Sequence, residues 1–255
     1  MKCLSSGSLA LDQSRRPPQG VADDHRELEK YAYENRHRWQ WEVGSALAKR
    51  LGAAGHQTML SFNKDANELD AAARRYGART GTSSDAASFG EVVVLAVPWN
   101  VVKLALRQAG SLHGKVLWDC TNALKAEYTS REVGTITSGG EIVSRLAPGA
   151  RVVKAIPPSA PLLLSDDPMV DGKPVACLLC SDDAAAKATV MPLVSALPAQ
   201  AVDFGPLSNA RFAEPAMMVI VRLAFGLNRG YRLGFALLTE NTVGPLGRTR
   251  ELETA

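Results

Sequence analysis

Three polar side chains stand close together where a predicted strand over residues 57–62 ends: Ser61, Asn63 and Lys64. They supply a hydroxyl, an amide and an ammonium group, and the first acid, Asp65, comes only after them. At the end of the second strand of a nucleotide-binding unit, an acid accepts a hydrogen bond from the ribose 2′-hydroxyl, whereas donor and cationic groups bind a 2′-phosphate. The set therefore favours NADP over NAD, and the alternative is an ordinary polar loop.

The segment before this strand is typical of a phosphate-binding helix. Residues 43–51 read Val-Gly-Ser-Ala-Leu-Ala-Lys-Arg-Leu, and Gly44 takes the place of the last glycine of a G-x-G-x-x-G fingerprint. The glycine loop and the apolar strand that should precede this helix are absent from the sequence as written. In their place, residues 33–42 are polar, aromatic and free of glycine.

Reading that segment one base later explains the interruption. The codons of residues 39–42 then encode Gly-(Asn/Ser)-Gly, whichever synonymous codons are used. The codons of residues 33–39 permit Met-Lys-Ile-Gly-Ile-Gly in the same shifted frame. Restoring one lost base before Val43 gives Met-Lys-Ile-Gly-Ile-Gly-Gly-(Ser/Asn)-Gly-x-Val-Gly, a short apolar strand and a complete fingerprint ending at Gly44. We therefore predict that residues 1–42 are translated from the wrong frame, through a mutation or a sequencing error. The alternative is a genuine N-terminal extension.

Strands and helices alternate along the rest of the chain. Strands are predicted over residues 57–62, 78–80, 91–97, 115–119, 151–155, 175–180 and 200–204, and helices over 44–54, 66–76, 83–88, 100–109, 140–146, 184–197 and 211–227. This alternation predicts an α/β fold, a Rossmann-like doubly wound parallel sheet with C-terminal helices. The last helix is apolar on all sides, which predicts that it is buried, at the interface of a homodimer.

The predicted organisation has four parts. Residues 1–42 are the doubtful segment, and residues 43–165 form an NAD(P)-binding Rossmann domain without its first strand. Residues 166–239 continue the α/β pattern on the side of the redox acceptor, and residues 240–255 form a polar, flexible tail.

The composition is that of an ordinary globular protein, with 46% apolar and 22% charged residues and a net charge of +3. Neither a basic block nor an apolar run of about 18 residues is present, so we expect no nucleic-acid partner, no membrane span and a cytoplasmic location. Cys177 and Cys180 lie in an apolar run without a second ligand pair. We expect buried thiols there and no metal, although half of a zinc site or a redox pair is the alternative.

The chain resembles the NADP-dependent reductases of the deazaflavin coenzyme F-420 and their bacterial relatives, over about residues 43–238. The resemblance rests on the order and spacing of several short matches. These are residues 43–48, Gly55-His56, Val93-Val94-Leu95-Ala96-Val97-Pro98-Trp99, residues 114–123, Val152-Val153-Lys154-Ala155, Gly205-Pro206-Leu207, Arg211 and Glu214-Pro215. Each match alone is common among Rossmann dehydrogenases, so their combination carries the resemblance.

The resemblance implies where the cofactor lies. Ala96, Val97, Pro98 and Trp99 would line the cofactor beside the pyrophosphate and the nicotinamide ribose, and Asn122, Ala123 and Ala155 would lie on the nicotinamide side. Ligands of open α/β sheets do sit beyond the carboxyl ends of the strands. The alternative for Pro98 and Trp99 is a strand-end turn with a packed indole, and Asp119 would cap the turn that follows it.

The same resemblance implies an NADPH-dependent oxidoreductase that transfers a hydride between NADP and a small-molecule acceptor such as a deazaflavin, a flavin, a quinone or a ferric chelate. Relatives carry Ala-Phe-Asn where this chain has Ala155 followed by Ile156-Pro157-Pro158, which puts the deazaflavin in doubt. No catalytic side chain is assigned, because His56 and His113 read as loop residues and the cofactors carry the chemistry. The competing interpretation is a non-catalytic dinucleotide-binding protein or an inactive remnant.

Overall fold

The computed structural model describes residues 42–61, 65–125, 130–134, 136–227 and 229–238, all within one compact unit. The doubtful segment up to residue 41, the predicted phosphate contacts Asn63 and Lys64, and the tail from residue 239 onward lie outside the described residues.

The first part of the chain folds much as its local signals predict. A helix over residues 42–53 is followed by β1 (Met59–Leu60), α2 (Ala66–Tyr76) and β2 (Arg79–Thr80). Asp65 accepts hydrogen bonds from the main-chain amides of Asn67 and Glu68, in the first turn of α2, and Gly77 ends the helix at a φ of 66°. A carboxylate at the first position and a left-handed glycine after the last are strong helix boundaries, and the predicted bounds of this helix are confirmed.

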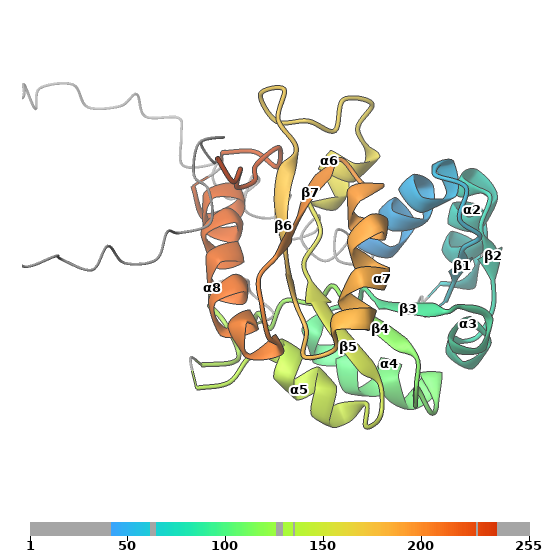
Figure 1. The fold of residues 1–255 in the computed structure, drawn as a ribbon. Helices are drawn as coiled ribbons and strands as arrows, with labels where there is room; N and C mark the ends of the chain where they lie inside the picture. The colour runs from blue at the N-terminus through green and yellow to red at the C-terminus, as the bar shows by residue number, and fades with distance from the viewer. Residues whose placement is uncertain (1–41, 62–64, 126–129, 135, 228, 239–255) are drawn as a thin grey trace, which may run out of the picture. The chain divides into compact units, whose positions relative to one another are not determined.

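The main sheet has five strands in the order β3-β4-β5-β6-β7 (Figure 1). Its members are β3 (Val92–Leu95), β4 (Val116–Asp119), β5 (Arg151–Ala155), β6 (Val175–Cys180) and β7 (Ala199–Asp203). The pairs β3–β4, β4–β5 and β6–β7 are parallel, and β5–β6 is antiparallel. The predicted α/β fold is confirmed, and its sheet is mainly parallel.

The antiparallel pair departs from the wholly parallel sheet that the sequence pattern predicts. Between β5 and β6 the chain forms only a five-residue helix, α6 (Ala160–Leu164), and a loop. A parallel neighbour requires a crossover of a dozen or more residues, usually a long helix that packs across the sheet. With only α6 to pack there, β6 re-enters the sheet from the edge at which β5 ends. The predicted second part, from residue 166, continues the same sheet.

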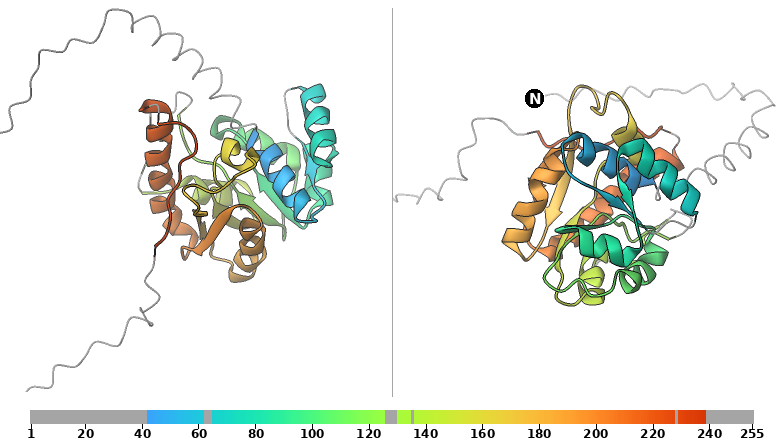
Figure 2. Two further views of the ribbon diagram at one scale, coloured as in Figure 1. Left: turned by 90° about the horizontal axis from the view of Figure 1, so that it is seen from above. Right: turned by 90° about the vertical axis from the view of Figure 1, so that its right-hand side faces the viewer.

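Helices cover both faces of the main sheet (Figures 1 and 2). One apolar cluster joins the helix over residues 42–53, α6 and α7 (Ala184–Ser195) to the sheet. The other joins α3 (Ser83–Phe89), α4 (Val102–Ala109) and α5 (Gly139–Leu146) to the opposite face. Alternation along β4 supplies both clusters, because Val116 and Trp118 pack in the first and Leu117 in the second.

The C-terminal helix is less covered than its sequence predicts. α8 (Ala210–Val221) continues into a π-helical turn (Arg222–Gly226), and its buried residues are Ala210, Ala213 and Glu214. Phe212 is 66% exposed and Val219 is 49% exposed. The chain itself therefore covers one side of α8 and leaves apolar side chains on the other. Among the described residues, no helix is both long and apolar enough to span a bilayer.

Among the described residues, no strand joins β1 to β3. β1 and β2 form a separate parallel two-stranded sheet, and β3 stands at the end of the five-stranded one. In the doubly wound strand order 3-2-1-4-5-6, the first strand lies between the second and the fourth. In this protein β1 corresponds to the second strand of that order, β2 to the third and β3 to the fourth. The break between β1 and β3 therefore falls where the first strand would lie. That is the strand that the sequence as written lacks.

Candidate functional site

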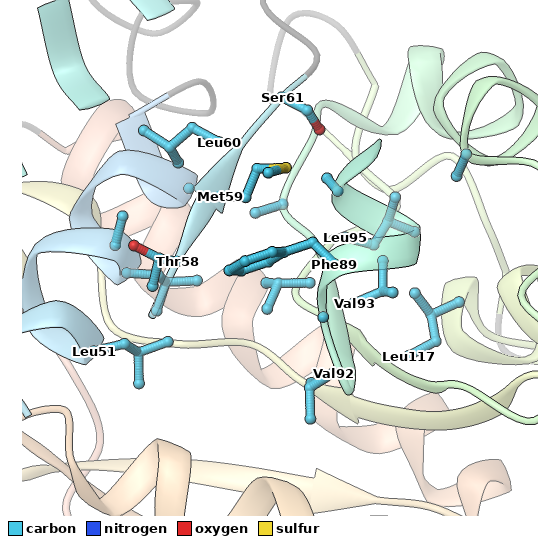
Figure 3. A pocket seen from close by; sticks show the side chains of 18 of the residues that line it. Leu51, Thr58, Met59, Leu60, Ser61, Phe89, Val92, Val93, Leu95 and Leu117 are labelled. Atoms are coloured by element: carbon cyan, nitrogen blue, oxygen red, sulfur yellow. The ribbon is translucent and has the colours of Figure 1, made fainter. Parts of the chain in front are cut away.

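A cavity of about 740 Å³ lies at this break (Figure 3). β1 and β3 form two of its walls, and the helix over residues 42–53 contributes Leu47 and Leu51. Four of the predicted cofactor contacts, Gly44, Ser61, Ala96 and Val97, line it as well. Residues from three separate parts of the sequence thus meet around one opening, as expected where several parallel strands end.

Pro98 and Trp99 do not line this cavity. Pro98 precedes a short 3-10 helix, Trp99–Val101, and the Trp99 indole packs partly buried against the α3–α5 side of the sheet. Trp99 also lines a second, open cavity of about 510 Å³, together with Asn100, Val102, Lys103, Leu124, Lys125, Glu132 and Leu146. The indole therefore both packs against the protein and borders open space.

Trp99 and Ala123 meet at the N-terminus of α5. A Cβ atom on Gly139 would lie 3.2 Å from Cζ3 of Trp99 and 3.2 Å from Cβ of Ala123. Any side chain at this position would push the two apart, so glycine allows the segments after β3 and β4 to converge. The structure thus brings together two groups of residues that the resemblance places along the cofactor.

Asn122 follows β4 and directly precedes Ala123, and its side-chain amide is a polar group in the interior. Its Oδ1 is buried and has no hydrogen-bond partner within the described part of the chain. A buried amide oxygen without a partner costs roughly 1–3 kcal/mol, and such groups in native proteins call for a ligand or a water. Oδ1 of Asn122 is therefore an acceptor without a partner in the described residues, and Asn122 lines neither of the two cavities.

Pro98, Asn122, Ala123 and Ala155 are predicted site residues that line neither cavity, and Ala155 is the one held in the core of the sheet. Its side chain is fully buried in the apolar core, and its carbonyl accepts a hydrogen bond of 2.8 Å from Nε1 of Trp118. It lines neither of the two cavities described above. Ala155 ends a strand, as predicted. Its side chain packs against the apolar core, however, and its carbonyl is already hydrogen-bonded to Trp118.

A buried ionic cluster, Lys154–Asp119–Glu214, lies beneath the segments that carry Trp99 and Asn122. Nζ of Lys154 is 3.0 Å from Oδ2 of Asp119 and 3.4 Å from Oε1 of Glu214, and all three side chains are at most 1% exposed. Oδ1 of Asp119 also accepts hydrogen bonds from the amide and hydroxyl of Thr121, at 2.9 and 2.7 Å. The predicted capping role of Asp119 is confirmed, and the ion pair adds a second role. The cluster fixes the path of the chain from β4 towards Asn122.

The charge of Lys154 is maintained by its two partners. Burial alone would lower the pKa of this ammonium group, but the carboxylates of Asp119 and Glu214 outweigh burial and raise the pKa. Lys154 is therefore protonated at neutral pH, and its positive charge offsets part of the cost of burying two carboxylates.

Glu214 also binds the N-terminus of α5. Its two carboxylate oxygens accept hydrogen bonds of 2.9 Å from the main-chain amides of Gly139 and Gly140. The amides at the start of a helix lack partners within the helix and attract negative charge. Nearby, Arg211 donates two hydrogen bonds to Glu141, and this contact, together with those from Ser138, lowers the pKa of the Glu141 carboxyl to about 2. α8 therefore holds α5 through two carboxylate contacts.

Lys154 and Glu214 are structural residues of the site that the sequence reasoning did not identify. A signal for Lys154 was present, because a lysine inside the apolar run of residues 151–155 must be paired if the strand is buried. Its partners could not be named, since they come from β4 and α8. Cys177 and Cys180 are buried, as predicted, and burial raises the pKa of each thiol to about 12. Within the described ranges, no group of three or more His, Cys, Asp or Glu side chains is placed to hold a metal ion.

Comparisons with known proteins show the family of the chain. Residues 42–123 match the family described as "NADP oxidoreductase coenzyme F-420-dependent". A hypothetical protein from Sinorhizobium meliloti has a similar structure, with 31% sequence identity, a TM-score of 0.58, and coverage of 66% of this chain and 82% of that one. The chain belongs to the coenzyme F-420-dependent NADP oxidoreductase family. The family match begins at residue 42, next to the point at which the sequence begins to read as a Rossmann domain.

Two further solved structures are similar to this chain. A proposed F-420-dependent NADP reductase from Arthrobacter sp. FB24 is 28% identical, with a TM-score of 0.68 and coverage of 78% of this chain and 96% of that one. A reductive aminase from Aspergillus terreus, in complex with NADPH4, cyclohexanone and allyl amine, is 17% identical, with a TM-score of 0.52 and coverage of 74% of this chain and 59% of that one. The second likeness concerns the fold alone.

Proposed function

We propose that the protein with its glycine loop intact is an NADPH-dependent oxidoreductase that transfers a hydride between NADP and a small-molecule redox acceptor. The acceptor would be a deazaflavin such as coenzyme F-420, a flavin, a quinone or a ferric chelate. Family membership supports the reaction class. The observation that carries the proposal is that Trp99 and Ala123 both approach Gly139, and that Asn122, the residue before Ala123, has a buried Oδ1 without a partner among the described residues.

The residues present fit the nicotinamide half of NADP. Oδ1 of Asn122 is an acceptor that the carboxamide amide would satisfy, and Trp99 borders an open cavity. The cofactor supplies the hydride, and the residues of this chain position it and shield it from water. For the pyrophosphate half, the described residues provide Gly44 at the cavity but no glycine loop. The frame-restored segment would supply the main-chain amides that bind the pyrophosphate.

The break in the sheet favours a second candidate for the chain as written. Without main-chain amides from a glycine loop, the helix after it cannot bring its N-terminus against a pyrophosphate. A chain in this state would be a remnant that binds dinucleotide poorly and has no reductase activity. The two candidates are separated by NADPH binding to the 255-residue chain.

The contribution of Asn122 can be tested in the frame-corrected enzyme. Asn122→Ala should lower kcat/KM for NADPH roughly 5- to 10-fold, the effect of losing one hydrogen bond of about 1–1.5 kcal/mol. The assay is NADPH oxidation against a panel of deazaflavin, flavin, quinone and ferric-chelate acceptors. Gln108→Ala removes the same type of group from an exposed position on α4 and should have no effect. Equal activity of the two variants, or a panel without any acceptor, would contradict the proposal.

Cofactor preference can be tested at Lys64. We expect the frame-corrected enzyme to prefer NADPH to NADH, because Ser61, Asn63 and Lys64 end the strand without an acid. Lys64→Ala removes a charge-assisted phosphate contact of about 1.5–3 kcal/mol and should raise the Michaelis constant for NADPH by roughly 10-fold or more. The constant for NADH should remain nearly unchanged, and an equal effect on both cofactors would show that Lys64 does not bind the 2′-phosphate.

We also propose a homodimer formed through the exposed side of α8. Val219 and Phe212 present apolar surface there that the described part of the chain does not cover. Light scattering should give twice the chain mass for the frame-corrected protein, and Val219→Lys should shift it to a monomer. Leu104→Lys, at a 40% exposed position on α4, is the matched control and should remain a dimer. A monomeric parent protein would rule out this interface.

A further inference from the structure

The helix over residues 42–53 borders the large cavity on one side and is bonded to α6 on another. Gly44 lies at the cavity end of this helix. Further along it, Nζ of Lys49 and the guanidinium of Arg50 donate hydrogen bonds of 2.5–2.7 Å to the carbonyl oxygens of residues 163–165. These carbonyls end α6, where a helix has unpaired acceptors and favours cations. The end of α6 therefore fixes the position of the helix that presents Gly44 to the cavity.

Ser165 also contacts the C-terminal segment over residues 229–238. Nη1 of Arg232 donates hydrogen bonds to Oγ of Ser165 at 2.8 Å and to the carbonyl of Asp167 at 2.7 Å, and Nη2 donates to the carbonyl of Met169 at 2.7 Å. Oγ of Ser165 in turn donates to the carbonyl of Asp167 at 2.8 Å. The rigid fork of a guanidinium holds several acceptors in one geometry. One arginine thus fixes the loop that follows α6, beginning at the residue whose carbonyl binds Arg50.

The C-terminal segment is itself attached to the fold on both sides of Arg232. The carbonyl of Tyr231 accepts a hydrogen bond of 2.9 Å from Oγ of Ser159, at the start of α6. The carbonyl of Phe235 accepts one of 2.7 Å from the amide of Ala176, in β6. The guanidinium therefore extends from an anchored main chain, so its contacts hold the loop in place.

We propose that Arg232 is a positioning residue for NADP, which acts through Ser165 and Arg50 to hold the helix over residues 42–53 in its binding orientation. The proposal rests on the proposed function and adds to it a residue that lines neither cavity. The N-terminus of a helix binds phosphate only when its amides are directed at the anion. A small tilt of this helix therefore weakens cofactor binding, while the groups around the transferred hydride stay in place.

Cofactor affinity in the frame-corrected enzyme tests this role. Arg232→Ala should raise the Kd for NADPH roughly 3- to 10-fold, the range of effects transmitted through intermediate residues. The Michaelis constant for NADPH should rise with it, and kcat should stay within about 2-fold. Arg229→Ala removes an exposed arginine from the same segment and should change neither constant. A merely structural residue would lower the unfolding temperature and leave the Kd of the folded protein unchanged. Unchanged affinity, or a fall in kcat without a rise in the Michaelis constant, would overturn the proposal.

A double-mutant cycle tests the route through Arg50. Arg50→Ala should weaken NADPH binding at least as much as Arg232→Ala, because it removes the last contact of the series. The double variant should then bind NADPH within about 2-fold of Arg50→Ala alone, since residues that act in series are not additive. Fold-changes that multiply would show that Arg232 acts by another route, and would overturn the proposal.

Amide hydrogen exchange tests the same contacts without cofactor. Arg232→Ala should accelerate exchange at least roughly 3-fold in the helix over residues 42–53. α4 packs on the opposite face of the sheet and serves as the internal control, which should keep its protection. Unchanged exchange in the helix would overturn the proposal whether or not an acceptor is found. A parent protein without affinity for NADPH would refute the proposed function, whereas normal affinity of the variant beside a binding parent would overturn the positioning role alone.

Discussion

Replacing residues 1–42 by the frame-restored start is expected to increase NADPH affinity at least about 100-fold, and to raise the thermal unfolding temperature. Two independent losses are reversed. The sheet regains the strand between β1 and β3, and the pyrophosphate regains the main-chain amides of the glycine loop. Two charge-assisted hydrogen bonds of about 1.5–3 kcal/mol each suffice for this gain in affinity. NADPH is titrated into both chains by calorimetry or fluorescence.

A third chain that starts at Val43 controls for the removal of residues 1–42 by itself. It lacks both the translated segment and the glycine loop, so it should bind as weakly as the 255-residue chain. Should the 255-residue chain be stable and bind NADPH as tightly as the corrected one, residues 1–42 would be a true part of the protein. The interpretation of the cavity as an empty strand position would then be wrong.

Lys154→Ala in the corrected chain is expected to cost about 3–5 kcal/mol in the free energy of unfolding. The substitution leaves the carboxylates of Asp119 and Glu214 buried without a cation, which is among the most costly changes in a protein interior. Urea denaturation at pH 7 measures the effect. Because the pKa of Lys154 is raised, its contribution is fully present below about 10.5, the ordinary pKa, and is lost only at higher pH.

Two further variants show whether the ionic cluster causes this loss. Lys173→Ala removes an exposed lysine and should change the unfolding free energy by no more than about 0.5 kcal/mol. The double variant Lys154→Ala, Glu214→Gln should lose less than the sum of its single changes, since neutralising Glu214 leaves one fewer buried charge. A loss below about 1 kcal/mol for Lys154→Ala, or strictly additive changes, would contradict the electrostatic role of the cluster.

The parts of the fold that the sequence predicted well depend on local signals. α2 has the predicted bounds because Asp65 and Gly77 cap it within its own sequence, and the predicted bounds of β5 and β6 are likewise confirmed. The direction of β6 could not be predicted from its own residues, because it depends on how the connection through α6 packs. The exposure of α8 also depends on which elements reach it, and an apolar helix sequence cannot distinguish burial within one chain from burial between two.

In the candidate site too, local sequence signals predicted some residues, and others depended on three-dimensional packing. Gly44 was predicted from the glycine fingerprint, Ser61 from the end of the second strand, and Ala96 and Val97 from the family resemblance, and all four line the cavity. The general rule that ligands bind beyond the carboxyl ends of parallel strands agrees with these predictions. The rule fixes the edge of the sheet but not the surroundings of each residue, which is why Ala155 lies in the core. The Lys154–Asp119–Glu214 cluster required three-dimensional packing, because its residues lie on β5, β4 and α8.

The most direct test of the central claim is the nucleotide sequence of the gene across codons 33–43. Read one base later, it should encode Met-Lys-Ile-Gly-Ile-Gly-Gly-(Asn/Ser)-Gly, with one base missing before the codon of Val43. The codons are then constrained: Tyr33 is TAT, Asn35 is AAT and His37 is CAT, because only these give the methionine and the two isoleucines. A TAC, AAC or CAC codon at these positions would place threonine in the shifted reading and would contradict the account.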